Sequence, residues 1–273
     1  HLSLRRQRQM CIRDRFIQGD KAITDLLSQP EAIEVWWPES VRKLLGNHSL
    51  ANRNGAAHKA RRRVVAQLFS SSALQRYSPG IIDLINYLCK ELKTAKTPLP
   101  LAEKMRRFAF SVIATTVLGL EGNDREKLFS DFEIWTKALF SIPIAVPGSP
   151  FAKALKARKR LLKKLQEILS QPINGKGGLD LLAGGLDEAG IPFSDEDLGE
   201  QLLLLLFAGY ETTASALSCL MRELLLNPKV KTWLLEEIDA LEWPPTPEKA
   251  PICLLYTSPS PRDATLSRMP SSA

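Results

Sequence analysis

The sequence predicts a mainly α-helical fold with a small β portion. Apolar residues recur at three- and four-residue spacing through most of residues 16–250, which is the period of an amphipathic helix. Clusters of proline and glycine, such as "IPIAVPGSP" (142–150), separate these segments. Of the 273 residues, 44% are hydrophobic and 25% are charged, a composition typical of a protein with a sizeable core. Because no repeat or linker divides residues 16–250, we expect one domain there.

The predicted strand lies near the start of this domain. "IEVWW" (33–37) combines β-branched and aromatic residues directly before Pro38, which favours a short strand. Helical spacing then predicts five helices, at residues 56–69, 81–92, 105–120, 125–140 and 151–169.

The longest predicted helix follows these five. In "SDED" we interpret Ser194 as the N-cap and Asp197 as the acidic partner that completes a capping box. The helix is expected to end at Asn227, because Pro228 follows it. Its stretch "LLLLLFAGYETTASALS" (202–218) contains Glu211 as its one charged residue, so a membrane span is an alternative. We favour a buried central helix, since the same stretch also contains threonine and serine.

The polar residues in this apolar stretch point to a ligand site. Ala208, Glu211, Thr212 and Ser215 fall close to one side of the helix at three- and four-residue spacing. Ala208 and Gly209 remove side-chain bulk, so a flat ligand could lie against the backbone. The Thr212 hydroxyl can bond back to a carbonyl one turn earlier, and a buried Glu211 beside it could transfer protons. The alternative is a kinked core helix whose glutamate is paired elsewhere.

A second candidate site precedes it. His58 and Arg62 lie four residues apart, on one face of a predicted helix, and could together bind carboxylates. The alternative is a solvated basic face, since Lys59, Arg61 and Arg63 accompany them.

These two motifs resemble those of the cytochrome P450 family. "AGYETT" (208–213) is similar to the pattern [AG]-G-x-[DE]-T-[TS] in the long central helix of that family. The His58 and Arg62 pair precedes it in the family's order, on the helix that meets the haem propionates. Residues 36–77 and 138–162 are most similar to the branch that contains cyanobacterial P450s and animal retinoic-acid hydroxylases.

The resemblance implies a haem monooxygenase with a P450-like helical domain. Such an enzyme inserts one oxygen atom of O₂ into an apolar small-molecule substrate, here retinoid- or isoprenoid-like, with electrons from a ferredoxin or a P450 reductase-type donor. It implies that Thr212 assists protonation of bound dioxygen and that Glu211 relays protons. Ala208 and Gly209 are implied to leave room for oxygen, and His58 and Arg62 to bind the propionates.

The family's axial cysteine is absent from this chain. It lies in a loop of the form F-x-x-G-x-R-x-C, and none of Cys11, Cys89, Cys219 and Cys253 has those neighbours. No E-x-x-R follows Asn227 either. We therefore expect a P450 truncated before its proximal haem-binding part, with little catalysis of its own. Cys89 and Cys219 lie in apolar helical patterns and are expected to be small core residues.

The two ends differ from the domain between them. Residues 1–15 are a basic tail and residues 251–273 a Ser/Pro-rich tail, both interpreted as non-native or disordered. The tails carry +4 and +1 of the net charge of +7, which leaves +2 for residues 16–250, so a nucleic-acid partner is not expected.

The sequence leaves the function and the cellular location open. The alternative function is a non-catalytic helical binding protein derived from the distal half of a P450. The expected location is the cytoplasm if the source is bacterial, or the endoplasmic reticulum membrane if a eukaryotic anchor has been lost.

Overall fold

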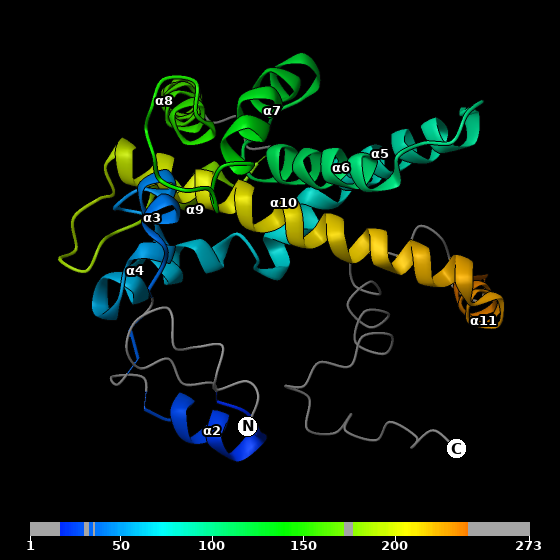
Figure 1. Ribbon diagram of the computed structural model, residues 1–273, viewed down its shortest axis with the longest axis horizontal. Helices are drawn as coiled ribbons and strands as arrows, with labels where there is room; N and C mark the ends of the chain where they lie inside the picture. Colours follow the sequence, from blue (N-terminus) through cyan, green and yellow to red (C-terminus); the bar gives the residue numbers. More distant parts are fainter. Residues whose placement is uncertain (1–16, 30–32, 35, 172–176, 240–273) are drawn as a thin grey trace. The chain divides into compact units, whose positions relative to one another are not determined.

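The computed structural model describes residues 17–29, 33–34, 36–171 and 177–239 (Figure 1). The chain divides into two units, His1–Trp36 and Trp37–Ala273. Within the described residues of the first unit there is one helix, α2 (Asp20–Leu27). The two predicted tails, residues 1–15 and 251–273, lie outside the described part of the chain.

Apart from one isolated β bridge, the regular elements in the described residues of the second unit are helices. Its helices, including the short 3₁₀ helix η3, are α3 (Glu39–Leu45), η3 (Leu50–Asn52), α4 (Gly55–Gln67), α5 (Ser71–Thr94), α6 (Leu101–Thr116), α7 (Gly122–Thr136), α8 (Pro150–Leu169), α9 (Leu179–Ala183), α10 (Asp195–Leu226) and α11 (Pro228–Asp239). The five helices predicted between residues 56 and 169 are confirmed as α4 to α8, and the longest predicted helix is α10.

The strand predicted at residues 33–37 is not found in the described residues of that stretch. Ile33, Glu34, Trp36 and Trp37 have no strand structure, and the β pairing found in the described residues is a single bridge elsewhere. A strand requires a neighbouring strand to satisfy its backbone groups, and β propensity alone does not provide one. Trp37 instead donates its indole N–H to the Ala51 carbonyl at 3.0 Å.

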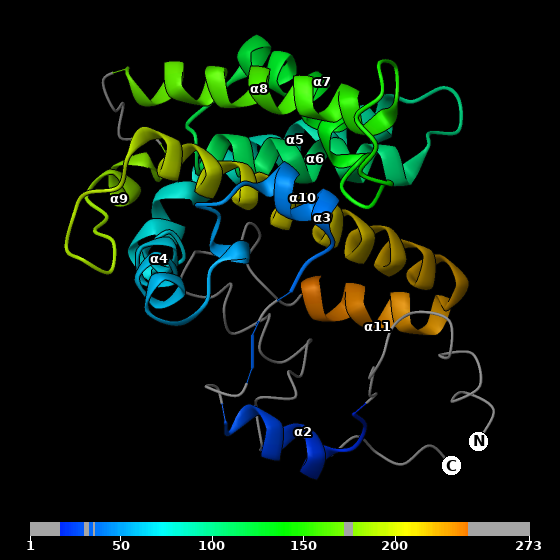
Figure 2. The same ribbon diagram turned by 60° about the vertical axis from the view of Figure 1, so that its left-hand side comes forward.

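Helix α10 forms the centre of the second unit. It packs most extensively on α6 and also on α8, while α7 lies beside α8 and α5 beside α6 (Figures 1 and 2). Aromatic rings fill the junction of α6, α7 and α10: the Phe110 and Phe129 centroids are 4.9 Å apart, and Phe132 meets Tyr210 edge-on at 5.0 Å. This packing fixes α10 against α6 and α7 along the middle of its length.

The N-terminus of α10 is capped as predicted, but only in part. The Ser194 hydroxyl accepts a hydrogen bond from the Asp197 amide at 3.1 Å, which confirms the N-cap. The Asp197 carboxylate does not complete a capping box, because it accepts hydrogen bonds from Arg61 and Gln201 instead. An ion pair with a buried guanidinium outweighs a bond to one backbone amide.

Burial along α10 changes from complete to one-sided. Residues 197–203 are all buried, whereas beyond them the buried positions of this helix are Leu206, Tyr210 and Ala214. The side opposite this stripe carries Ala208, Thr212, Ser215, Ala216 and Cys219, which are all exposed; we call these five residues the open face of α10. Within the described residues α10 is also the one helix long and apolar enough to cross a membrane.

Candidate functional site

The open face of α10 has a distinct backbone interaction at its centre. The Thr212 hydroxyl donates to the Ala208 carbonyl at 2.6 Å, which confirms the predicted bond to a carbonyl one turn earlier. In such a bond the hydroxyl points back toward its own helix, and the carbonyl accepts a second hydrogen bond besides that of the helix backbone. Every side chain of the open face is small, so the backbone of α10 is accessible along a flat strip.

Gly209 lies next to this strip but contacts α6. A Cβ atom at position 209 would lie 2.6 Å from both Cγ1 and Cδ1 of Ile113, well inside van der Waals contact. The absence of a side chain therefore lets α6 approach α10 closely. This close approach gives a packing reason for glycine at this position.

Glu211 forms an ion pair with α6. Its carboxylate accepts hydrogen bonds from Arg106 of α6 at 2.9 and 3.1 Å, and its side chain is 47% exposed. The expectation of a buried Glu211 is thus wrong, because its carboxylate is half-exposed and paired with a cation on the neighbouring helix. The same hydrogen bond raises the pKa of the Arg106 guanidinium, which remains charged.

The predicted pair on α4 occupies two different environments. His58 is half-buried, and its Nδ1 lies 3.3 Å from the Leu50 carbonyl of η3. Arg62 is exposed, and among the described residues no hydrogen bond or ion pair engages its guanidinium. Arg62 is therefore free to bind an anion, whereas one nitrogen of His58 already has a partner.

Arg61, between them, is buried, so the alternative of a solvated basic face does not extend to this residue. Its side chain is 4% exposed. Its Nε and NH2 donate to the Asp197 carboxylate, the former at 3.3 Å, and NH1 donates to Glu188 at 3.0 Å. Burial lowers the pKa of Arg61, but the hydrogen bonds to Asp197 and Glu188 outweigh it and leave that pKa raised.

The sequence contains a signal for the burial of Arg61. Val64, Val65 and Leu68 are buried on α4, and Arg61 precedes them by three, four and seven positions, which places it on the same helical face. A cation in that register requires a buried anion as partner. The resulting ion pair ties α4, and with it His58 and Arg62, to the first turn of α10.

A second polar cluster holds the segment before η3 against α10. Glu200 accepts a hydrogen bond from the His48 amide at 2.6 Å and is paired with Arg158 of α8. Gln201 donates to the His48 carbonyl at 2.5 Å. Gly46 has φ +97°, and a Cβ there would collide with Glu200, so glycine is required at this position.

Both described cysteines are exposed. Cys89 lies on α5 and Cys219 on the open face of α10, so the expectation that they are core residues is wrong; an apolar pattern marks the helix but not which side is covered. In the described part of the chain, no three His, Cys, Asp or Glu side chains gather as a metal site.

Two features therefore characterise the candidate site. The long helix α10 carries an alanine–threonine strip, and the basic helix α4 is tied to its first turn. The family model for cytochrome P450 matches residues 31–246. The chain therefore belongs to the cytochrome P450 family, whose members are haem-dependent monooxygenases.

Relatives within the family are similar over about half of their length. A putative cytochrome P450 120 from Synechocystis sp. is 34% identical over 239 residues, which cover 82% of this chain and 54% of that protein. Cytochrome P450 26B1 from Danio rerio is 32% identical over 221 residues, covering 78% of this chain and 43% of that protein. The solved structure of a retinoic acid-bound cyanobacterial CYP120A1 superposes with a TM-score of 0.71 at 33% identity, covering 77% of this chain and 49% of that one.

Haem is the cofactor of this family, and the residues present fit it. The open face of α10 offers only small side chains, so a planar macrocycle can approach the helix there. Arg62 offers a guanidinium without a partner among the described residues, and carboxylates such as propionates are its natural ligands. The open face and Arg62 are therefore the candidate haem-binding surface of this chain, whose sequence contains no F-x-x-G-x-R-x-C loop.

Proposed function

We propose that this chain forms the oxygen-binding wall of a haem monooxygenase that hydroxylates an apolar small molecule. The observation that carries the proposal is the pair formed by Ala208 and Thr212 on the open face of α10, with its hydroxyl–carbonyl bond of 2.6 Å. Family membership makes haem the group that lies against this face. When bound, haem supplies the oxygen-activating and electron-accepting chemistry.

Thr212 is the residue whose hydroxyl would donate a proton to a ligand on the open face. A hydroxyl has one proton to donate and two lone pairs to accept with, so Thr212 Oγ1 can exchange the Ala208 carbonyl for a ligand on the open face. Ala208 leaves the space for that ligand. Gly209 contributes by allowing α10 to pack closely on α6, which fixes the position of the open face relative to α6.

Glu211, paired with Arg106, is the group that would pass protons between solvent and this hydroxyl. Glu211 is the next residue to Thr212 in the chain, and its half-exposed carboxylate can take up protons from water. The ion pair with Arg106 holds the carboxylate in one orientation. We assign Glu211 the role of proton relay on this basis.

His58 and Arg62 bind the propionates. Arg62 provides a guanidinium, which matches a carboxylate with two parallel hydrogen bonds, and His58 provides its remaining ring nitrogen. The ion pair between Arg61 and Asp197 keeps α4 at the start of α10, so that both side chains are presented from a fixed helix.

The relatives support a proposal for the class of substrate. One similar solved structure contains retinoic acid, which supports a retinoid- or isoprenoid-like substrate. Electrons come from a ferredoxin or a P450 reductase-type donor. A bacterial source places the protein in the cytoplasm, and a eukaryotic source with an anchor places it on the endoplasmic reticulum.

A chimeric protein tests the proposal. It joins residues 31–246 to the remaining sequence of the Synechocystis relative, which supplies a thiolate-bearing loop. We expect this chimera to bind haem and, after reduction with carbon monoxide, to absorb near 450 nm, as haem-thiolate proteins of this family do. The 273-residue chain alone is expected to lack that band, because none of its cysteines lies in such a loop.

The two α4 residues provide the internal comparison. Arg62→Met and His58→Ala in the chimera are expected to reduce the haem bound per protein, whereas Lys59→Met on the same helix is expected to leave it unchanged. A folded chimera that takes up no haem, or equal haem content in all of these variants, contradicts the proposal.

A further inference from the structure

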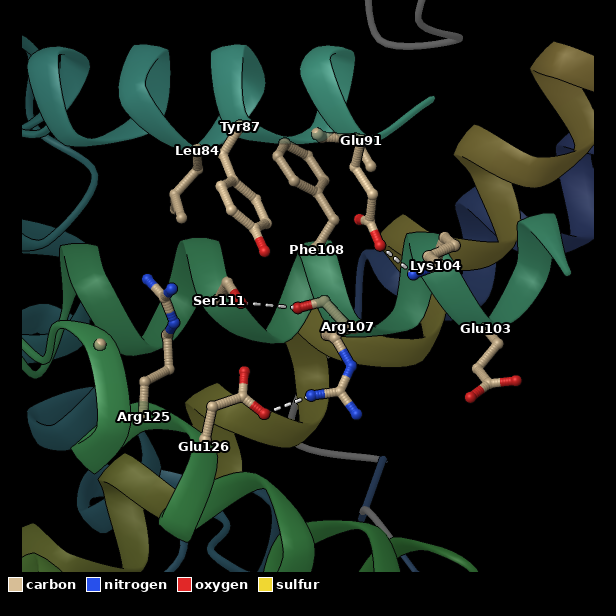
Figure 3. A pocket seen from close by; sticks show the side chains of 12 residues that line it. Leu84, Tyr87, Glu91, Glu103, Lys104, Arg107, Phe108, Ser111, Arg125 and Glu126 are labelled. Carbon is tan, nitrogen blue, oxygen red and sulfur yellow. Dashed lines mark hydrogen bonds and ion pairs between the residues drawn. The ribbon is translucent and has the colours of Figure 1, made fainter. Parts of the chain in front are cut away.

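A cavity of about 630 Å³ lies between α5, α6 and the start of α7 (Figure 3). None of the residues that the proposed haem site uses lines it. Pockets of roughly 300–1,000 Å³ hold small-molecule ligands. We propose that this cavity is a second binding site, which takes a small carboxylic acid with an apolar body.

One wall of the cavity is apolar and aromatic. Leu84 and Tyr87 point from α5 toward α6, and the ring of Phe108 rises from α6 beside them (Figure 3). Tyr87 is 70% exposed, which is unusual for a large ring facing a neighbouring helix. An apolar ligand body lying between Tyr87 and Phe108 would remove both rings from water.

Most charges around the cavity are already neutralised. Lys104 is paired with Glu91, and Arg107 is paired with Glu126 (Figure 3). The Arg107 guanidinium also stacks on the Phe129 ring at 4.6 Å. These groups have little free capacity to bind a charged ligand.

Arg125 is different, because its guanidinium is held by a hydroxyl. Its NH1 donates to Thr115 Oγ1 at 3.2 Å. Its Nε is buried and has no hydrogen-bond partner among the described residues. In Figure 3 the guanidinium points up from α7 toward Tyr87, into the space that Leu84 borders, while Glu103 points away from it. The terminal nitrogens make one hydrogen bond among the described residues, from NH1 to Thr115, so a cation with unused terminal donors faces the apolar wall.

This arrangement selects the charge and shape of the ligand. A single guanidinium with an unused donor matches a monoanion, and a carboxylate pairs with arginine in a planar, hydrogen-bonded geometry. The apolar wall on α5 and α6 requires a hydrocarbon or aromatic body attached to that carboxylate. The Tyr87 hydroxyl can donate a further hydrogen bond to the same group.

Calorimetric titration of the 273-residue chain with decanoate, below its micellar concentration, tests this site. We expect one equivalent to bind, and Arg125→Met to weaken binding at least about tenfold, the loss for one hydrogen bond to a charged group. Decanol, which has the same body without the charge, is expected to bind the Arg125→Met variant and the parent chain equally. Lys127→Met, an exposed cation on the same helix, serves as the control and is expected to leave decanoate affinity unchanged.

A second variant locates the ligand without removing a charge. Leu84→Trp fills the cavity from the α5 side and is expected to abolish binding of both probes, with circular dichroism confirming that the helices remain. The proposal is overturned if decanoate does not bind at millimolar concentration. It is also overturned if decanoate binds the Arg125→Met or Leu84→Trp variant as tightly as the parent chain.

Discussion

Replacing Arg61 with methionine removes one partner from a buried ion pair and leaves the other without its cation. Both side chains are almost fully buried, at 4% exposure for Arg61 and 5% for Asp197. Methionine preserves much of the aliphatic stem, so the change is mainly one of charge. Breaking a buried pair from one side costs about 3–5 kcal/mol. At roughly 2–4 °C per kcal/mol for a chain of this size, the midpoint of thermal unfolding should fall by about 6–20 °C.

The assay is urea unfolding followed by circular dichroism at 222 nm. Arg62→Met is the matched control, because this neighbouring side chain is exposed and has no partner in the described residues; its effect should stay within about 0.5 kcal/mol. The double variant Arg61→Met with Asp197→Leu should recover most of the stability, since an apolar pair replaces the ionic one. The reasoning is refuted if Arg61→Met costs no more than Arg62→Met.

Three further predictions concern packing and pH. Gly209→Ala should destabilise the fold by about 1–2 kcal/mol, because overpacking against α6 outweighs the gain in helix propensity. Adding Ile113→Ala in a double variant should relieve this loss. The control Gly199→Ala lies on the same helix with space for a methyl group, so it should be neutral or stabilising. Burial alone would raise the pKa of Asp131, but two neighbouring cations outweigh it and lower that pKa from 3.8. The resulting stabilisation, on the order of 1–2 kcal/mol, is present above pH 3.8 and is lost as the pH falls through the depressed pKa. The destabilisation caused by Asp131→Asn should therefore shrink between pH 6 and pH 3 in urea titrations. Burial raises the pKa of Tyr210 from 10.0 to about 12, so stability should decline as the pH rises from 10 toward 12, and Tyr210→Phe should flatten that decline in the urea midpoint; an unchanged slope contradicts the assignment.

The helices could be predicted because their signal is local. The 3.6-residue period locates α4 to α8, and the capping serine and the Asn227-Pro228 pair locate both ends of α10. The strand at residues 33–37 could not be judged this way, because a strand depends on a partner that its own sequence does not specify. Local propensity was correct only where the element satisfies its own backbone.

In the candidate site, the bond within α10 was predictable, but the contacts with neighbouring helices were not. The hydroxyl–carbonyl bond of Thr212 is internal to one helix, so the sequence was sufficient to predict it. The directions of Gly209 and Glu211 depend on where α6 crosses α10, which no single-helix pattern contains. The alternative of one solvated basic face does not hold for Arg61, which lies in register with the buried Val64 and Val65.

The central claim is that the open face of α10 delivers a proton to oxygen bound at haem. The most direct measurement is the fraction of consumed electrons that appears as hydroxylated product, rather than as peroxide, in the chimera that carries residues 31–246. The account predicts that Thr212→Ala shifts most electron flow to peroxide, while Thr213→Ala, the exposed neighbour outside the open face, leaves the partition unchanged. Equal coupling in both variants would contradict it.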